Sequence, residues 1–388
     1  MKILVVFGTR PEAIKLFPII HALKEDPSFN VSVCVTAQHR QMLDQVLGIT
    51  DIEPDVDLDL MKPNQSLSQL TSRILRGMDR TLATIRPDRV MVQGDTTTAM
   101  VAAISTFYHR IPVDHVEAGL RSGDNYSPFP EEANRKIISS IASLHFAPTR
   151  RAADALLREN VPRRQVYVTG NPGIDALIKI KDRIADYGNV RDVIDDQLPK
   201  AGDNRRVILV TAHRRENFDG GMERVASAIQ MLAQRDDVVV VFPVHPNPNV
   251  FGPIQSLLDG QPRVRLVPPL DYLPFIYLLS RADIVLTDSG GLQEEAPALG
   301  KPVLVMRTTT ERPEGVEAGT ALLVGTDPQR ITRETMRLLD DHAHYNRMSL
   351  AHNPFGDGHA SARILDILAC EAGIVPSAHS TEVLSHAL

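Results

Sequence analysis

Short apolar runs alternate with amphipathic helical segments along almost the whole chain, and this alternation constrains the fold more than any other feature. The expected strands of the first half are Ile3–Phe7, Val31–Val35, Arg89–Val92, Val113–Val116, Leu144–Ala147 and Val166–Val168. Those of the second half are Val207–Val210, Val238–Phe242, Val264–Val267, Asp283–Leu286, Val303–Val305 and Ala321–Val324. Helical patterns between them include Glu12–Glu25, Ser66–Ile85, Pro130–Ser143, Met222–Gln234 and Pro328–Leu339. Because apolar strands separated by helices are typical of parallel sheets covered on both faces, the sequence predicts an α/β fold.

Turn-forming residues suggest where the chain divides. The segment Gly170-Asn171-Pro172-Gly173 follows an expected strand, and 388 residues suffice for two domains with substantial cores. We therefore predict two doubly wound, Rossmann-like domains, residues 1–170 and 171–358, that face a central cleft. Ligands of such sheets bind beyond the carboxyl ends of the strands, so residues that follow strands are the functional candidates. Residues 374–388 lack clear periodicity and are predicted to form a loosely ordered tail.

Composition argues against several classes of protein. The net charge of −6 argues against general nucleic-acid binding. Cys34 and Cys370 make neither a disulfide framework nor a zinc site, and the histidines lack metal-ligand spacing, so we expect no metal. No apolar run approaches the length of a membrane span, and Met1–Phe7 is too short for a signal peptide. We therefore expect a cytoplasmic protein without a membrane partner.

The segment from Asp288 to Glu295 has the pattern of an anion site. It follows an expected strand and precedes Ala296–Gly300, which is predicted to be helical. Ser289, Gly290 and Gly291 let a phosphate approach the backbone, where unpaired N–H groups would bind it. Glu295 is placed to accept hydrogen bonds from ribose hydroxyls of the same ligand. A simple Gly-Gly turn accounts for these residues equally well, so the segment by itself leaves both interpretations open.

Two carboxylates and two cations follow expected strands of the first half. Arg10 and Lys15 lie in the segment that opens the first helix, and either is also explained as a solvated surface charge. Asp95 and Glu117 follow strands that are predicted neighbours, and such a pair can supply an acid and a base at neutral pH. A helix N-cap would explain Asp95 equally well. Neither GxGxxG nor GxxxxGK[ST] occurs, which weighs against a nicotinamide cofactor or a P-loop ATPase.

Further candidates lie at other helix and strand ends. Glu131 and Glu132 are in the first turn of an expected helix, where the helix dipole favours acidic residues. The dipole is the favoured explanation for Glu132, whereas Glu131 closely follows the Glu117 loop and is equally open to a functional role. His213 and Arg214 end the first strand of the second half, and a strand-end histidine favours function over structure. Arg312 follows the strand after the Ser-Gly-Gly segment and would be a second cation beside a diphosphate.

Many segments together resemble one family, the non-hydrolysing UDP-N-acetylglucosamine 2-epimerases. The matching segments are Gly8–Lys15, Thr36–Gln45, Gly94–Thr98, His115–Arg121, Pro130–Arg135, Thr211–Asn217, Asp288–Pro297, Gly300–Glu314 and Gly356–Gly358. The resemblance implies a fold like that of GT-B glycosyltransferases, with a C-terminal helix, 359–373, packed back on the first domain. It implies a homodimer and no cofactor. It also implies reversible conversion of UDP-GlcNAc to UDP-ManNAc, through elimination and re-addition of UDP at 2-acetamidoglucal, for a surface polysaccharide.

The resemblance also assigns roles to residues. By it, Asp95, Glu117 and Glu131 are the catalytic acids, and His213 is the catalytic histidine. The positions that hold UDP are Arg10, Lys15, Ser289, Gly290, Gly291, Glu295 and Arg312. Phe275 matches a residue near the uracil, and Leu270 stands where some relatives carry Gln, which affects one base contact. The candidates for a second, activating substrate site are Gln38, Gln41, Glu131, Arg214 and His245.

The sequence leaves other activities on the same scaffold open. The chain would also suit an epimerase of another UDP-2-acetamido sugar, a hydrolysing 2-epimerase that releases free ManNAc, or a GT-B glycosyltransferase. A catalytically silent UDP-sugar sensor is a fourth hypothesis. The presence of Asp95, Glu117 and His213 speaks against a sensor, because a sensor needs only the contacts to UDP.

Overall fold

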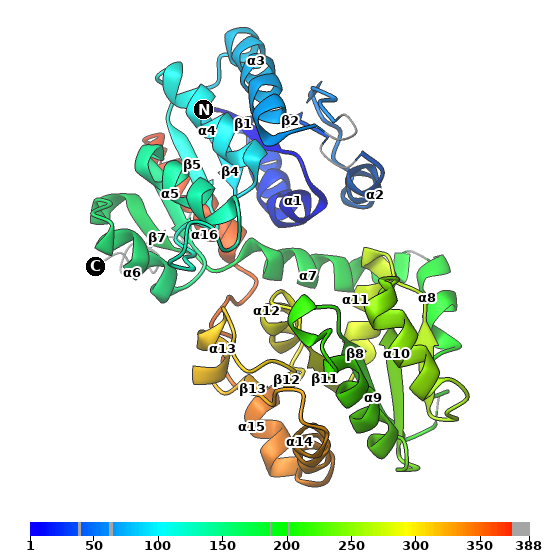
Figure 1. The fold of residues 1–388 in the computed structure, drawn as a ribbon. Coiled ribbons are helices and arrows are strands. Elements are labelled where there is room, and N and C mark those ends of the chain that lie inside the picture. The colour runs from blue at the N-terminus through cyan, green and yellow to red at the C-terminus, as the bar shows by residue number, and fades with distance from the viewer. Residues whose placement is uncertain (38–39, 62–64, 187, 201, 375–388) are drawn as a thin grey trace. The chain divides into compact units, whose positions relative to one another are not determined.

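The computed structural model describes residues 1–388 except 38–39, 62–64, 187, 201 and 375–388. The chain forms two compact units (Figure 1). The first comprises Met1–Ala176 together with the segment that begins at Gly356, and the second is Leu177–Phe355. The chain therefore leaves the first unit near residue 176 and returns to it near residue 356.

Within the described residues, the first unit has a seven-stranded sheet in the order β3-β2-β1-β4-β5-β6-β7. Every neighbouring pair is parallel. The strands are β1 Lys2–Phe7, β2 Asn30–Val35, β3 Val56–Asp57, β4 Arg89–Gln93, β5 Val113–Val116, β6 Leu144–Ala147 and β7 Val166–Val168. The helices are α1 Arg10–Glu25, α2 Arg40–Thr50, α3 Leu67–Ile85, α4 Thr97–Tyr108, α5 Glu131–Ile141, α6 Arg150–Arg158, η1 Arg163–Gln165, α7 Pro172–Arg183, which runs on into the second unit, and α16 Ala360–Glu371.

In the described part of the second unit, six parallel strands form a sheet in the order β10-β9-β8-β11-β12-β13. They are β8 Arg206–Thr211, β9 Val238–Pro243, β10 Val264–Val267, β11 Ile284–Thr287, β12 Val303–Val305 and β13 Ala321–Leu323. The helices are η2 Ile184–Asp186, α8 Gly188–Asp195, η3 Arg215–Asn217, α9 Gly221–Leu232, α10 Pro248–Leu258, α11 Tyr272–Arg281, α12 Leu292–Ala298, α13 Pro313–Glu317, α14 Pro328–Asp340 and α15 His342–Ser349.

The apolar strands are buried because helices cover them. In the first unit Leu4 and Val6 of β1 pack in one cluster with Ile74 and Met78 of α3. In the second, a cluster that contains Ile208 and Val210 of β8 takes in residues of α9, α10 and α14. The two parallel sheets with interleaved helices confirm the predicted α/β, Rossmann-like class.

Local sequence fixes where several helices begin. At α1 the Thr9 side chain and Glu12 form a capping box, and Pro11 occupies the first turn, where its missing N–H costs nothing. At α3 Ser66 and Gln69 form a second capping box, in which Ser66 accepts the N–H of Gln69. These caps place the loops that precede the helices, including the loop between β1 and α1.

Helix α16 completes the first unit, where it packs against α1. Asp175 ties its beginning to α7, because its carboxylate accepts the backbone N–H groups of Ala360 at 3.2 Å and Ser361 at 2.7 Å. Apart from Ile374, the predicted C-terminal tail lies outside the described residues. None of the helices in the described part of the chain has the length and hydropathy of a membrane-spanning segment.

Candidate active site

Glu117 follows β5 directly and is held in an uncommon conformation. Its φ of 62° lies in the left-handed region, which is costly for a residue with a side chain, and the residue is 8% exposed. The Nζ of Lys15 lies 2.5 Å from its Oε1, and Asn171 donates to the same oxygen at 3.3 Å. Gln93, at the end of β4, donates to Oε2. The carboxylate is therefore fixed by donors from α1, β4 and the segment before α7.

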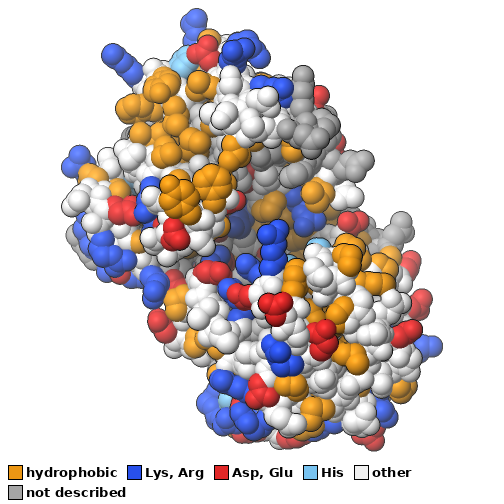
Figure 2. All heavy atoms as spheres, in the orientation of Figure 1, with side chains coloured by type: hydrophobic (Ala, Val, Ile, Leu, Met, Phe, Trp, Pro, Cys, Tyr) orange, Lys and Arg blue, Asp and Glu red, His pale blue; other side chains and the backbone are white. Residues whose placement is uncertain are grey.

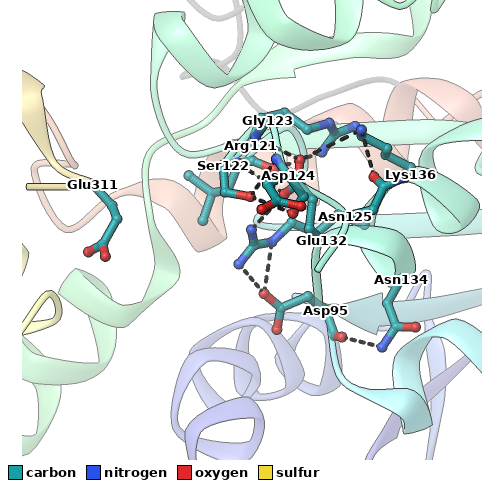
Figure 3. Close-up of polar contacts among 12 residues, drawn as sticks. Asp95, Arg121, Ser122, Gly123, Asp124, Asn125, Glu132, Asn134, Lys136 and Glu311 are labelled. Atoms are coloured by element: carbon teal, nitrogen blue, oxygen red, sulfur yellow. Dashed lines mark hydrogen bonds and ion pairs between the residues drawn. The ribbon is translucent and has the colours of Figure 1, made fainter. Parts of the chain in front are cut away.

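Asp95 follows β4, the strand next to β5, and belongs to a second group of polar residues (Figure 3). Its Oδ2 accepts a hydrogen bond from Nε of Arg135 of α5 at 2.8 Å and forms an ion pair with Nη2 of the same residue at 2.6 Å. Asn134 donates to its backbone carbonyl at 2.8 Å. The N-cap of α4 is Thr96, whose hydroxyl accepts the N–H of Ala99. Helix capping therefore does not account for Asp95. Each of the two predicted strand-end carboxylates has a cation of its own.

Glu132 is linked to the Asp95 group through Arg135. Its buried carboxylate accepts the N–H groups of Ser122 at 3.0 Å and Gly123 at 3.2 Å, and it pairs with Nη1 of Arg135 at 3.0 Å. Burial raises the pKa of Glu132, but these hydrogen bonds and Arg135 outweigh it, and the net pKa is lowered. The helix dipole, which accounted for this residue in the sequence, is thus an incomplete explanation. Glu131 is the first residue of α5 and is partly buried.

Glu12 joins two of the strand-end loops. Its Oε2 accepts the backbone N–H groups of Gly8 at 3.0 Å and Thr9 at 2.8 Å, while its Oε1 accepts the hydroxyl of Thr96 at 2.7 Å. Burial raises the pKa of Glu12, although these hydrogen bonds oppose the shift. The loop after β1, which leads to Arg10 at the start of α1, is therefore connected to the loop after β4, which carries Asp95.

In the second unit, Asp288 organises the loop that carries His213. Asp288 follows β11, is fully buried, and accepts with Oδ2 the backbone N–H groups of His213 at 2.9 Å and Arg214 at 2.8 Å. Asn217 donates to the same oxygen at 3.1 Å. A pocket of about 400 Å³ lies at this loop, lined by His213, Arg214, Arg215 and Glu216.

The imidazole of His213 stands among charged and aromatic groups. Its Nδ1 lies 3.5 Å from Oδ1 of Asp288, and its ring stacks on His245 with centroids 5.8 Å apart. Partial burial lowers the pKa of His213, Asp288 acts in the opposite direction, and Arg214 and His245 add to the lowering. The neutral imidazole is thereby favoured in the absence of a ligand.

In the turn Ser289-Gly290-Gly291, neither the backbone conformation nor the packing of the chain requires glycine at 290 or 291. Neither glycine has a positive φ. A Cβ at Gly290 would lie 3.6 Å from the nearest atom, Nη2 of Arg214, and one at Gly291 would lie 4.0 Å from Oε1 of Glu295. At Gly8, by contrast, a Cβ would come within 2.3 Å of the Thr36 hydroxyl. The small residues at 290 and 291 thus leave backbone open to an approaching group.

Two arginines on neighbouring segments of the second unit are paired with carboxylates. Arg312, the N-cap of α13, is ion-paired with Glu294 of α12. Arg307 follows β12 and pairs with Glu216 and Glu311. Because α12 has only seven residues, its dipole is small, and an anion bound at this turn would depend mainly on the open backbone and the arginines.

The other predicted binding residues have the following places. Leu270 lies in the loop between β10 and α11, Phe275 lies in the first turn of α11, and both are partly buried. Glu295 is partly buried in the first turn of α12, and His245 is exposed after β9. Gln38 falls outside the described residues, and the side chain of Gln41, in α2, is not described either.

Comparisons with known proteins agree with one another. Residues 21–369 match the family model described as UDP-N-acetylglucosamine 2-epimerase. The chain is 54% identical over 369 residues to the UDP-N-acetylglucosamine 2-epimerase of Yersinia pestis, a match that covers 95% of this chain and 98% of the relative. It is 53% identical to the enzyme of that name from Escherichia coli K12, with the same coverage.

A solved structure gives the same result. The crystal structure of UDP-GlcNAc 2-epimerase from Neisseria meningitidis bound to UDP-GlcNAc matches with a TM-score of 0.84 and 47% identity, covering 95% of this chain and 100% of that one. The family match, the relatives and the fold therefore confirm the resemblance that the sequence motifs indicated. The chain belongs to the UDP-N-acetylglucosamine 2-epimerase family.

Proposed function

We propose that this protein interconverts UDP-GlcNAc and UDP-ManNAc by inverting C2 of the sugar. The observation that carries the proposal is the Glu117 carboxylate, which is held at the end of β5 in left-handed backbone with Lys15 2.5 Å away. Strain of this kind persists only where the surrounding structure enforces it, and it is concentrated at functional sites. Asp95 and Glu131 are proposed as the other acid–base groups.

The second unit is proposed to bind the UDP part of the substrate. The open backbone at Gly290 and Gly291 would take the diphosphate with Arg312, and Glu295 would accept hydrogen bonds from the ribose. Phe275 and Leu270 would contact the uracil, and Ser289, Arg10 and Lys15 complete the proposed set. The Neisseria meningitidis relative, whose structure is described as bound to UDP-GlcNAc, supports a UDP-sugar as the ligand.

The proposed reaction has two balanced halves. A base removes the C2 proton while the bond between C1 and the UDP oxygen breaks, which gives 2-acetamidoglucal and UDP. UDP then attacks C1 as a proton is delivered to the opposite face of C2. Because the C2 proton is weakly acidic, base catalysis alone would be slow, and stabilisation of the departing UDP anion must share the work. His213 is proposed to assist that departure. Both halves are redox-neutral, so the proposal calls for no nicotinamide.

The test is an incubation with UDP-GlcNAc in D2O, without acceptor or added cofactor, followed at C2 by NMR. UDP-ManNAc with deuterium at C2 is the expected product. Free ManNAc would identify the hydrolysing reaction instead. Exchange that occurs only with a different UDP-2-acetamido sugar would change the substrate. No C2 exchange in this incubation, together with sugar transfer in a parallel incubation that contains an acceptor, would identify a glycosyltransferase and defeat the epimerase proposal.

We also propose that the protein is a cytoplasmic homodimer whose product supplies a surface polysaccharide. Exposed hydrophobic side chains on the first unit support an assembly: Phe107 and Tyr108 end α4 at 53% and 70% exposure, and Ile137 of α5 is 40% exposed. Hydrophobic side chains gather over this part of the first unit in Figure 2. Light scattering of the purified chain gives the oligomeric state directly. Arg214 and His245 stay candidates for a second UDP-sugar site, which a sigmoidal rate curve would reveal.

A further inference from the structure

The buried carboxylate of Asp288 uses its two oxygens unequally. Oδ2 accepts the N–H groups of His213 and Arg214 and the side chain of Asn217. Oδ1 is also buried, yet within the described part of the chain no hydrogen-bond donor reaches it. A buried polar atom without a hydrogen-bond partner destabilises the folded state, so such atoms in native proteins call for an explanation.

One group stands in position to satisfy Oδ1. The Nδ1 of His213 lies 3.5 Å away, just beyond a hydrogen bond. The His213 side chain is 43% exposed, so it has room to turn by the few tenths of an ångström required. In unliganded enzymes such contacts are often long and shorten only when the substrate is bound. Because Asp288 also accepts the backbone N–H of His213, the position of the carboxylate relative to the imidazole is restricted.

We propose that Asp288 is a positioning residue for His213: it holds a proton on Nδ1, so that Nε2 is the ring atom that gains and loses a proton. The role of His213 in the reaction rests on the proposed function, whereas the pairing of Asp288 with His213 does not. During departure of UDP, the protonated ring would donate from Nε2 to a diphosphate oxygen. When the proton leaves Nε2, the neutral ring keeps its Nδ1–H toward Asp288.

The charged and titratable surroundings of His213 agree with this role. Asp288 is the acidic neighbour, at the end of β11, and it favours the protonated ring. Arg214, in the same loop, and His245, after β9, oppose protonation. Partial burial, Arg214 and His245 together outweigh Asp288, so the pKa of His213 is lowered, and the Asp288 carboxylate stabilises the ring when it is protonated.

The test variant is Asp288→Asn. The amide oxygen must take the place of Oδ2, because two backbone N–H groups point at it. The amide N–H2 then faces Nδ1 and donates to it, which forces the neutral ring to carry its proton on Nε2. The matched control is Asp283→Asn, at the opposite end of β11, where the carboxylate likewise accepts a backbone N–H from the β8 segment, that of Val207 at 2.7 Å.

The decisive measurement is the ¹⁵N NMR spectrum of the His213 ring, assigned by the signals that disappear in His213→Gln. In the wild-type protein above the pKa of His213 we expect the Nδ1–H tautomer, in Asp283→Asn the same, and in Asp288→Asn the Nε2–H tautomer. An Nε2–H tautomer in the wild type overturns the proposal, and this measurement does not depend on activity.

Kinetics give the second readout. We expect Asp288→Asn to lower kcat for C2 epimerisation by ~100-fold or more, while the dissociation constant for UDP changes less than about fivefold. Equal losses of kcat in Asp283→Asn, or a full kcat in Asp288→Asn, would contradict the positioning role. If the wild type fails to epimerise but shows the Nδ1–H tautomer, the proposed function is wrong and the pairing of the two residues stands.

Discussion

Nζ of Lys15 lies 2.5 Å from Oε1 of Glu117, which makes a cation on α1 the partner of the carboxylate that ends β5. The two residues are 102 positions apart in the chain, and the Glu117 side chain is 7% exposed. The pair thus fastens the first helix of the first unit to its central sheet. It also sets the charge around the group that we propose to exchange the C2 proton.

Replacing Lys15 by Met should weaken both the fold and the reaction. Removing the cation leaves a nearly buried carboxylate with fewer partners, and we expect the free energy of unfolding to fall by about 1–3 kcal/mol. C2 exchange should fall at least about tenfold, because Glu117 loses the donor that orients its carboxylate. Urea unfolding and deuterium incorporation measure the two effects. Lys24→Met, on the exposed side of the same helix, is the control and should change neither. Full exchange activity in Lys15→Met would show that the pair is structural only.

Neutralising the proposed acid–base groups should separate binding from chemistry. In Glu117→Gln and in Asp95→Asn, we expect C2 exchange to fall by about 10²–10⁴-fold, the usual contribution of a positioned proton-transfer group. UDP binding, measured by calorimetry, should persist in both variants. Loss of UDP binding would instead mean that these carboxylates organise the site rather than move protons.

The stabilising effect of Glu132 should depend on pH. The pKa of Glu132 is lowered from its ordinary value of 4.5, so the folded state favours the ionised form. Its contribution to stability is therefore present above pH 4.5 and is lost as the pH falls through the lower pKa of the folded protein. Glu132→Gln should reduce the free energy of unfolding by about 1–3 kcal/mol at pH 7, because hydrogen bonds to Ser122, Gly123 and Arg135 weaken.

Urea titrations of the wild type and Glu132→Gln at pH 7 and at progressively lower pH make the comparison. The difference in unfolding free energy should shrink as the pH drops. Asp154→Asn, whose side chain is 49% exposed on α6, serves as the control. A difference for Glu132→Gln that grows toward acid would refute the assignment.

Replacing Gly290 by Ala should weaken ligand binding without destabilising the fold. A Cβ there meets only ordinary contacts, so Gly290→Ala should change the free energy of unfolding by no more than about 0.5 kcal/mol. The same methyl would stand where the diphosphate approaches, and we expect UDP to bind at least tenfold more weakly.

Gly8→Ala gives the opposite pattern and is the matched comparison. Its Cβ would lie 2.3 Å from the Thr36 hydroxyl and 2.6 Å from that of Thr98, so the variant should lose about 1–3 kcal/mol of stability. Thermal unfolding and UDP calorimetry on both variants decide the matter. Unchanged UDP affinity in Gly290→Ala would rule out this turn as the phosphate site.

Most strands were predictable because apolar residues dominate them, even where a strand also carries charged or polar residues, as β5 (VDHV) and β10 (VRLV) do. The exception is β3, Val56–Asp57, which has two residues and no run of its own and exists only because β2 offers an edge to pair with. Tertiary pairing, not local pattern, makes it a strand. The strand-end candidates Asp95, Glu117 and His213 were found because position after a strand can be read from the chain.

Their partners could not be read in the same way. Arg135 lies 40 positions from Asp95, and nothing in a helical pattern reveals which way a guanidinium points. Glu132 was explained by the helix dipole, although its carboxylate accepts N–H groups from a loop nine and ten positions earlier. Asp288 begins the segment that was interpreted through its glycines, so the aspartate itself was given no role. In each case the missing information was a contact between distant parts of the chain.

The return of α16 to the first unit has a consequence for how the protein is made. Ile364, Ile367 and Leu368 of α16 are buried, yet this helix leaves the ribosome after the whole second unit. At typical elongation rates of about 5–20 residues per second, the roughly 180 residues between the two parts take roughly 10–40 s to synthesise. Throughout that interval the nascent first sheet lacks its last covering helix. A chaperone that shields apolar surface on growing chains would therefore have a defined period and a defined target on this one.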